Sequence, residues 1–253
     1  VAGDAYNVEN CHVTNSVTVF GISDYVGGVA GYVDGSITRS SSAATVTGKG
    51  TRIGGVVGCV QSNSSTAMTE CFNTGKVEGA NLVGGLVGDL YNGGTITDCY
   101  NTGSVTATAS SGAAGGLLGS FRYGTLKNSY SSTVPTAAKA GSVLGRLQDS
   151  QQKTLEKVYG LDGAEVLGVS GTITGATLKT ADELKALTTT DLSDKFTADS
   201  ENINGGYPIL AWQNSGSDEP VDPDHPAIDP NGWDGKASQT EPANVGGVYQ
   251  IAS

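Results

Sequence analysis

A short glycine-rich sequence returns five times along this chain and constrains the fold more than any other feature. The copies stand 26 to 31 residues apart, and they are VGGVAG at Val26, IGGVVG at Ile53, VGGLVG at Val83, AGGLLG at Ala114 and AGSVLG at Ala140. A second repeated sequence alternates with the first, as in MTECFNTGKV at Met68 and ITDCYNTGSV at Ile96. A fixed period of this length is typical of a protein built from stacked repeats.

The repeats predict β-strands rather than helices. Each repeated glycine would cost about 1 kcal/mol in a helix interior, whereas short runs of β-branched residues bounded by Gly and Asn favour strands. One repeat cannot bury its own apolar face, but stacked repeats can, with each strand pairing in parallel with its copy about 4.8 Å away. We therefore expect an all-β protein, a parallel and by general preference right-handed β-helix of about five coils of 26–31 residues.

Equivalent residues of successive coils should form columns. The first and fourth positions of the glycine-rich sequence are apolar in every copy, which predicts two core columns. The Gly-Gly pair between these positions predicts a corner that needs either a positive φ or a close backbone approach. Only the last copy departs from this pattern, because Ser142 replaces the second glycine.

The second repeated sequence places an apolar column three residues before a column of Cys and Ser. The apolar residues are Val8, Ile37, Met68, Ile96 and Leu126, and the small ones are Cys11, Ser40, Cys71, Cys99 and Ser129. Strict strand alternation cannot turn both columns inward, because they are an odd number of residues apart. We therefore expect a bend or bulge between them, near Thr97 and Asp98 in one copy.

Two of these columns raise a structural question about their side chains. Cys71 and Cys99 stand in adjacent coils at a separation that a disulfide can span, but parallel neighbours point side by side, which favours a ladder of buried thiols. Asn73 and Asn101 open NTG turns in the same two coils. A stacked ladder of their amides is the expected arrangement.

The repeated sequences resemble the GLUG-motif repeats of large bacterial surface proteins, which also occur outside the catalytic part of some IgA-specific metallopeptidases. VGGLVG and IGGVVG followed by CYNTGSV and CFNTGKV carry the resemblance, which extends over about residues 8–143. It implies an extracellular, secreted or wall-attached protein and a module without a catalytic site of its own.

The remainder of the chain divides by composition. Residues 1–170 hold the β-helix, and residues 171–214 are expected to cap its exposed strand edges, with a short helix that opens at Thr180 and has Glu183 as the partner of a capping box. Phe196, Tyr207, Leu210 and Trp212 are expected to form the small core of this cap. Residues 215–245 are rich in proline and acids and predict a linker, and residues 246–253 resemble the start of a further module.

Composition disfavours several functions. The net charge of −11 disfavours nucleic acid as a partner, and no apolar run is long enough to span a membrane. Four cysteines without a C-x-x-C pair and two distant histidines, His12 and His225, give little support for zinc or for a serine–histidine nucleophile. No cofactor or metal is expected.

Two neighbouring columns form a possible ligand-binding face made of Arg39, Glu70, Asp98, Phe72, Tyr100 and Tyr130. Glu70 and Asp98 would be neighbours about 5 Å apart, which suits an acid and nucleophile pair or a cation site, although a solvated charge ladder balanced by Arg39 is the favoured interpretation. The aromatic residues would offer a platform for sugar rings if exposed and would be packing if buried, and packing is favoured.

Three functions fit these observations. The favoured one is a non-catalytic structural or adhesive module of a bacterial surface protein, which acts as a spacer or as a binding surface for host glycan or protein and is joined to further domains of the same polypeptide. A polysaccharide-acting β-helix enzyme that uses Glu70 and Asp98 is the alternative. Ice binding by an outward array of Thr is the least favoured, because Lys76 and Glu78 interrupt the array.

Overall fold

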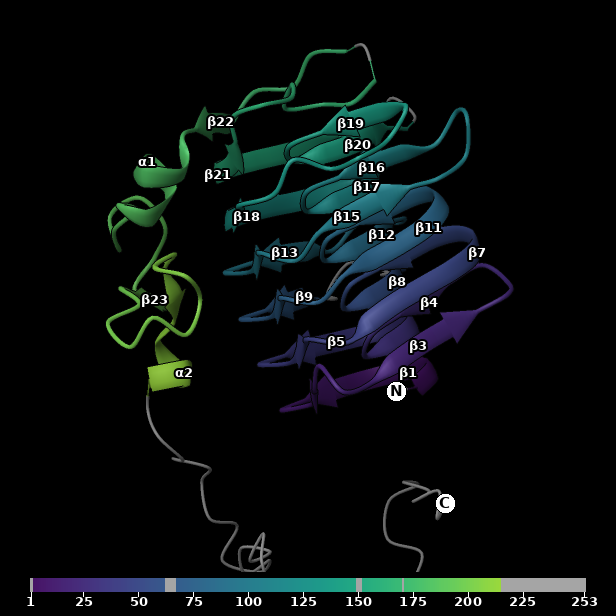
Figure 1. The fold of residues 1–253 in the computed structure, drawn as a ribbon, viewed down its shortest axis with the longest axis horizontal. Coiled ribbons are helices and arrows are strands. Elements are labelled where there is room, and N and C mark those ends of the chain that lie inside the picture. The colour runs from purple at the N-terminus through teal and green to yellow at the C-terminus, as the bar shows by residue number, and fades with distance from the viewer. Residues whose placement is uncertain (1, 62–66, 149–151, 170, 215–253) are drawn as a thin grey trace, which may run out of the picture. The chain divides into compact units, whose positions relative to one another are not determined.

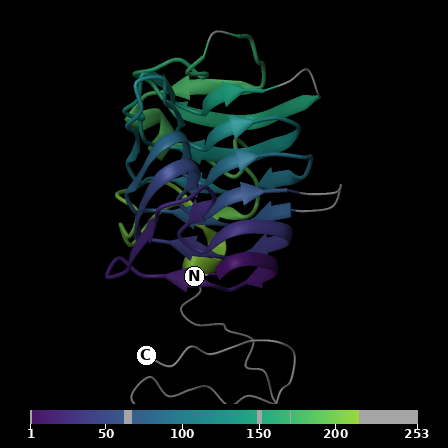
Figure 2. The ribbon, with the colours of Figure 1, turned by 90° about the vertical axis from the view of Figure 1, so that its right-hand side faces the viewer.

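The computed structural model describes residues 2–61, 67–148, 152–169 and 171–214. These residues form an all-β solenoid in which equivalent strands of successive coils lie above one another (Figure 1). Every strand pair among them is parallel except β23 with β24. Figure 2 shows the same stack from its side. The predicted parallel β-helix of about five coils is therefore confirmed.

Most strands belong to four parallel stacks. The first holds β1 (Ala2–Glu9), β5 (Ala30–Thr38), β8 (Val57–Val60), β12 (Val87–Leu90), β17 (Leu118–Phe121) and β20 (Leu144–Leu147). The second continues from β5 through β9 (Ala67–Thr69), β13 (Thr95–Thr97), β18 (Gly124–Ser131), β21 (Lys153–Leu161) and β22 (Ala176–Lys179). The third holds β2 (His12–Val13), β6 (Ser41–Ser42), β10 (Phe72–Asn73) and β14 (Tyr100–Asn101), which pairs with β18.

The fourth stack is a separate sheet. It holds β3 (Thr18–Gly21), β4 (Val26–Gly27), β7 (Thr45–Gly54), β11 (Val77–Gly84), β15 (Val105–Ala107), β16 (Ala113–Gly115) and β19 (Lys139–Gly141). The predicted core columns run through the stacks, and residues such as Val56, Leu86 and Leu117 are fully buried between them. The repeat thus buries collectively what a single coil could not.

The Gly-Gly pair does not adopt a positive φ, so that part of the prediction is wrong. Among the described residues, the glycines with positive φ lie elsewhere in the chain. The close backbone approach is confirmed instead, because a Cβ on Gly85 would lie 2.2 Å from the carbonyl oxygen of Gly116 and 2.3 Å from Cγ of Asn101. The pair is glycine because the next coil and the asparagine ladder leave no room for a side chain.

In the last coil, the glycine and the residue that faces it have exchanged places. Ser142 stands where the other coils have the second glycine, and Gly160 stands in the column where they have Asn101 or Ser131. A Cβ on Gly160 would lie 3.0 Å from Cβ of Ser142. One of the two facing positions must therefore be glycine, and the last coil has exchanged which one it is.

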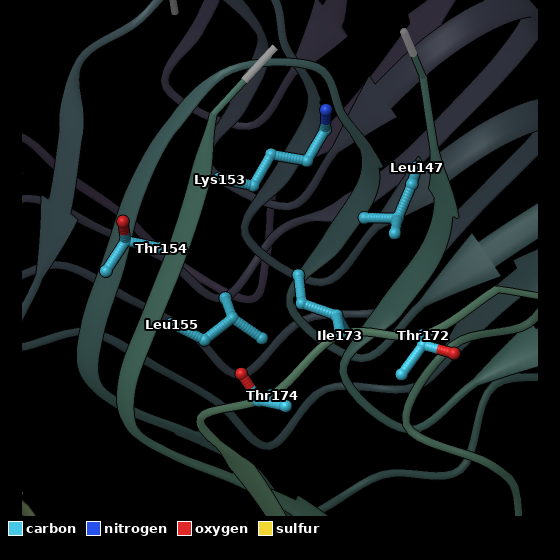
Figure 3. A pocket seen from close by; sticks show the side chains of 7 residues that line it. All are labelled: Leu147, Lys153, Thr154, Leu155, Thr172, Ile173 and Thr174. Carbon is cyan, nitrogen blue, oxygen red and sulfur yellow. The ribbon is translucent and has the colours of Figure 1, made fainter. Parts of the chain in front are cut away.

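The segment predicted as an end cap divides into two parts. Ile173 and Ala176 pack against the central core cluster, as do Val166 and Leu167 just before the segment, and β22 adds a parallel strand to β21. A cavity of about 400 Å³ lies beside Ile173 and is lined by Leu147, Lys153, Thr154, Leu155, Thr172, Ile173 and Thr174 (Figure 3). Only this first part lies over the end of the core.

The second part, residues 180–214, is called the strap below. It holds α1 (Ala181–Lys185), β23 (Phe196–Thr197), β24 (Ile209–Leu210) and α2 (Ala211–Asn214). The predicted capping box opens α1, because Thr180 Oγ1 accepts from the backbone N–H of Glu183 and the Glu183 carboxylate accepts from that of Thr180. The sequence predicts that this segment covers the strand edges at the end of the stack. The strap instead runs along one side of the coils (Figure 1).

The predicted linker at 215–245 and the predicted further module at 246–253 lie outside the described residues.

Candidate functional site

The charged column of the predicted ligand-binding face is a backbone bend. Asn10, Arg39, Glu70, Asp98, Asn128 and Lys157 all have φ between 45° and 55°. The left-handed region costs an ordinary residue about 1–2 kcal/mol, and Asn and Asp tolerate it best because of their short polar side chains. The expected bend near Asp98 is therefore present, and it turns both Ile96 and Cys99 into the core.

At the bend, side chains of the Cys and Ser column accept hydrogen bonds from backbone N–H groups of the neighbouring coil and donate to nearby carbonyl groups. The backbone N–H of Cys71 donates to Sγ of Cys99 at 3.5 Å, and the thiol of Cys99 donates to the carbonyl oxygen of Thr97 at 3.1 Å. Ser40 and Ser129 make equivalent contacts in their coils. All four cysteines are free, and burial, followed by the hydrogen bond to Cys71, raises the pKa of Cys99 well above its usual value. The predicted thiol ladder thus has a structural role.

The predicted asparagine ladder is also present. Asn73 Nδ2 donates to Oδ1 of Asn101 at 2.8 Å, and each amide closes its own NTG turn by accepting from the glycine N–H and donating to the glycine carbonyl. Both asparagines are fully buried. Their polar atoms are committed to the fold and are not offered to a ligand.

Glu70 and Asp98 are not a solvated charge ladder, because both residues are largely buried. Glu70 pairs with Arg39 at 3.5 Å, as expected. Asp98 accepts from Thr97 at 2.8 Å, from Asn128 at 3.1 Å and from Ser193 of the strap at 2.5 Å. The carboxylate of Asp98 therefore holds the strap against the bend.

The aromatic column is packed rather than open. The rings of Phe72 and Tyr100 are parallel with centroids 4.9 Å apart, and those of Tyr100 and Tyr130 are 5.3 Å apart. Tyr100 and Tyr130 are fully buried beneath strap residues that include Leu184, Leu187, Leu192, Phe196 and Leu210. The platform for sugar rings is thus not available, and the packing interpretation is correct.

Polar contacts fix the strap on these rings. The hydroxyl of Tyr130 donates to the carbonyl of Pro208 and accepts from Asn204 at 3.0 Å, and the hydroxyl of Tyr100 donates to Gln213 at 3.0 Å. Burial raises the pKa of both phenols. Trp212 lies with its ring centroid 5.7 Å from that of Phe72 and 5.3 Å from that of His12. The strap therefore reaches from the last coils back to the first.

Sequence reasoning missed a second polar cluster, on the side of β12. Asp89 is fully buried and accepts from Nε of Arg52 and from Nε of Arg122, each at 3.0 Å. The three residues come from three successive coils, and Arg52 also pairs with Asp24 at 3.3 Å. Asp89, Arg52 and Arg122 stand in different columns of the repeat, so comparing equivalent positions of successive coils gives no signal that they meet.

Electrostatics tie the members of this cluster together. Burial alone would lower the pKa of Arg52, but the hydrogen bond and the charge of Asp89 outweigh burial and raise it. The neighbouring thiol of Cys59 has its pKa raised to about 12, first by burial and then by Asp89. Cys59 is therefore an unreactive thiol at neutral pH.

Among the described residues, no three His, Cys, Asp or Glu side chains come together as metal ligands. The helices in the same part of the chain are all too short and polar to cross a membrane.

Comparisons with known proteins agree with this architecture. Residues 79–106 match the model of the GLUG motif. The chain is similar to the crystal structure of a putative immunoglobulin A1 protease from Bacteroides ovatus, with a TM-score of 0.57 and 19% identity over 83% of this chain and 75% of that chain. No curated protein matches the chain. The likeness to the Bacteroides protein concerns the fold alone, and the chain is a β-solenoid that contains a GLUG motif.

Proposed function

We propose that this chain is a non-catalytic repeat module of a bacterial extracellular surface protein. It acts as a spacer between other domains of the same polypeptide or as a binding surface for host glycan or protein. Five coils at about 4.8 Å each give a rigid body of roughly 24 Å between the domains that it separates.

One observation carries this proposal: the polar columns of the repeat are used to build the stack. The bend residues, the thiols and the asparagines all satisfy backbone or neighbouring groups from coil to coil. The GLUG motif and the fold shared with the Bacteroides protein support an extracellular setting.

The polysaccharide-cleaving alternative has lost its geometric support. It requires Glu70 and Asp98 to face a substrate, whereas Arg39 pairs with Glu70 and Ser193 of the strap donates to Asp98. Ice binding is disfavoured by an ion pair of 2.8 Å between Lys76 and Glu78, which stands in the column of Thr47 and Thr106.

The proposal is tested by a binding screen of the purified chain against glycans and host proteins, alongside an assay for release of reducing sugar. Saturable binding without sugar release is the expected result. Sugar release that Glu70→Gln abolishes would establish the enzyme instead. Binding to no glycan or protein would leave only the spacer role.

A further inference from the structure

The cluster around Asp89 extends into a face that the strap does not cover. This arginine–tyrosine face consists of residues on or beside β12, β17 and β20, namely Tyr91, Arg122, Tyr123 and Arg146, with Asp89 and Ser120 buried beneath it. We propose that it binds an acidic glycan, a polysaccharide that carries carboxylate or sulfate groups. Although the net charge of the chain is −11, this face is locally positive, because Arg122 and Arg146 outnumber the buried carboxylate of Asp89. This inference rests on the proposed function, because it assigns a ligand class and a location to the binding surface.

Asp89 and Tyr91 fix the guanidinium of Arg122 in an orientation that can bind an anion. Its Nε donates to Asp89 at 3.0 Å, and its guanidinium carbon lies 4.5 Å from the ring centroid of Tyr91. Among the described residues, the hydrogen bonds of its side chain all go through Nε to Asp89, so that the two terminal nitrogens can donate to a ligand. A guanidinium that is fixed in this way loses little entropy when it pairs with a carboxylate or sulfate.

The next two coils contain donors that the protein leaves unpaired. The column of Asp89 continues to Ser120 and then to Arg146. Ser120 is fully buried, and its Oγ and the buried Nε of Arg146 have no hydrogen-bond partner within the described part of the chain. Buried polar groups are rarely left unpaired, and the charge of the Arg146 guanidinium, which pairs with no carboxylate among the described residues, makes this part of the column positive and favours a ligand that carries negative charge. Asp89 is already shared by Arg52 and Arg122, so it cannot neutralise Arg146.

Tyrosines beside these donors favour a glycan over an acidic peptide. Tyr91 is 41% exposed and Tyr123 is 40% exposed, and they follow β12 and β17, which are adjacent strands. Half-exposed phenol rings offer an apolar surface to the C–H face of a sugar and a hydroxyl to its oxygens. An added peptide strand would need an open sheet edge, whereas β12 is paired on both sides by β8 and β17.

The test measures binding of the whole chain to four immobilised polymers: polygalacturonate as a polyuronate, chondroitin sulfate, neutral dextran and poly-glutamate. The structure predicts saturable binding to one or both acidic glycans, weakened by added salt, and none to dextran. Arg122→Gln should reduce the affinity by at least about tenfold, because hydrogen bonds between charged groups are lost.

Two further variants separate binding from folding. Arg146→Gln removes an unpaired buried donor and Tyr123→Ala removes an exposed ring, so both should keep the thermal unfolding midpoint and still reduce the affinity several-fold. Tyr6→Ala is the matched control, since Tyr6 is 71% exposed on β1 and lies outside the face. Its affinity should equal that of the unmodified chain.

Four results would overturn the inference. Equal binding to dextran would show that the glycan need not be acidic. Binding to the acidic glycans that all face variants retain would show that this face is not the site, although the chain would remain a glycan-binding module. Binding to poly-glutamate that Arg122→Gln removes would identify an acidic peptide as the ligand. Binding to none of the four polymers would reject the acidic glycan, and the broader screen would then decide between a protein ligand and the spacer role.

Discussion

Tyr123 and Tyr130 belong to the same coil and stand seven residues apart, yet Tyr130 is fully buried and Tyr123 is 40% exposed. The strap packs over Tyr130 and its column, whereas the arginine–tyrosine face lies on another side of the coil. The comparison teaches that the repeat sets which residues stack, while a segment outside the repeat decides which stacked side becomes core. A column of aromatic residues in a solenoid is therefore a docking surface for the chain's own strap as readily as for a ligand.

The largest expected loss of stability comes from truncating the buried tyrosine of this pair. Tyr130→Ala should destabilise the fold by about 3–5 kcal/mol, because it leaves a cavity and removes the hydrogen bonds to Pro208 and Asn204. Tyr123→Ala should change the stability by less than about 0.5 kcal/mol. Urea unfolding followed by circular dichroism measures both. Equal effects of the two substitutions would contradict the difference in burial.

A larger residue in the Gly-Gly pair should destabilise the stacking of successive coils. Gly85→Val places a side chain against Gly116 and Asn101, and we expect a loss of about 3 kcal/mol. Gly3→Val is the control, because nothing lies within 4 Å of a Cβ at Gly3. Unchanged thermal stability of Gly85→Val would refute the close backbone approach.

The thiol ladder permits a sharper comparison at a single position. Cys99→Ala leaves the buried N–H of Cys71 without an acceptor and should cost about 1–3 kcal/mol. Cys99→Ser should cost less, since Ser40 and Ser129 already fill this column in other coils. If Ala is tolerated as well as Ser in chemical unfolding, the column is packing only.

Alkaline pH should destabilise the fold through the buried thiol of Cys59. Cys59 beside Asp89 has its pKa raised to about 12, so the folded chain holds this proton after the unfolded chain has lost it. The contribution of Cys59 is therefore complete below about pH 8.5 and is lost as the pH rises towards 12, at about 1.4 kcal/mol per pH unit. Urea unfolding at several pH values in this range should show that the free energy of unfolding falls less steeply with pH in Cys59→Ala than in the unmodified chain. The same dependence on pH in both proteins would contradict the burial of the thiol.

The sequence alone predicts the part of the structure that repeats. Parallel stacking, the core columns, the bend at Asp98 and the ladders of Cys99 and Asn101 all follow from periodicity, because each coil has the same neighbours. The capping box at Thr180 is also predictable, since it depends on residues three apart.

The candidate site could not be predicted in the same way. The strap contacts Tyr130 through Asn204 and Asp98 through Ser193, and no periodic signal links positions so distant in sequence. The polarity of the bend column suggests solvent exposure, whereas it reflects the left-handed backbone that Asp98 and its equivalents adopt. The Asp89 cluster was missed because its partners stand in different columns.

The central claim is that the strap is part of the folded stack and keeps the aromatic column buried. Trp212 reports on it directly when Trp233, the other tryptophan, is replaced by Phe. Equilibrium unfolding in urea should then give the same midpoint by Trp212 fluorescence and by the far-ultraviolet circular dichroism of the sheets. A Trp212 transition at clearly lower urea, with the sheets still folded, would show that the strap detaches on its own and would contradict the account.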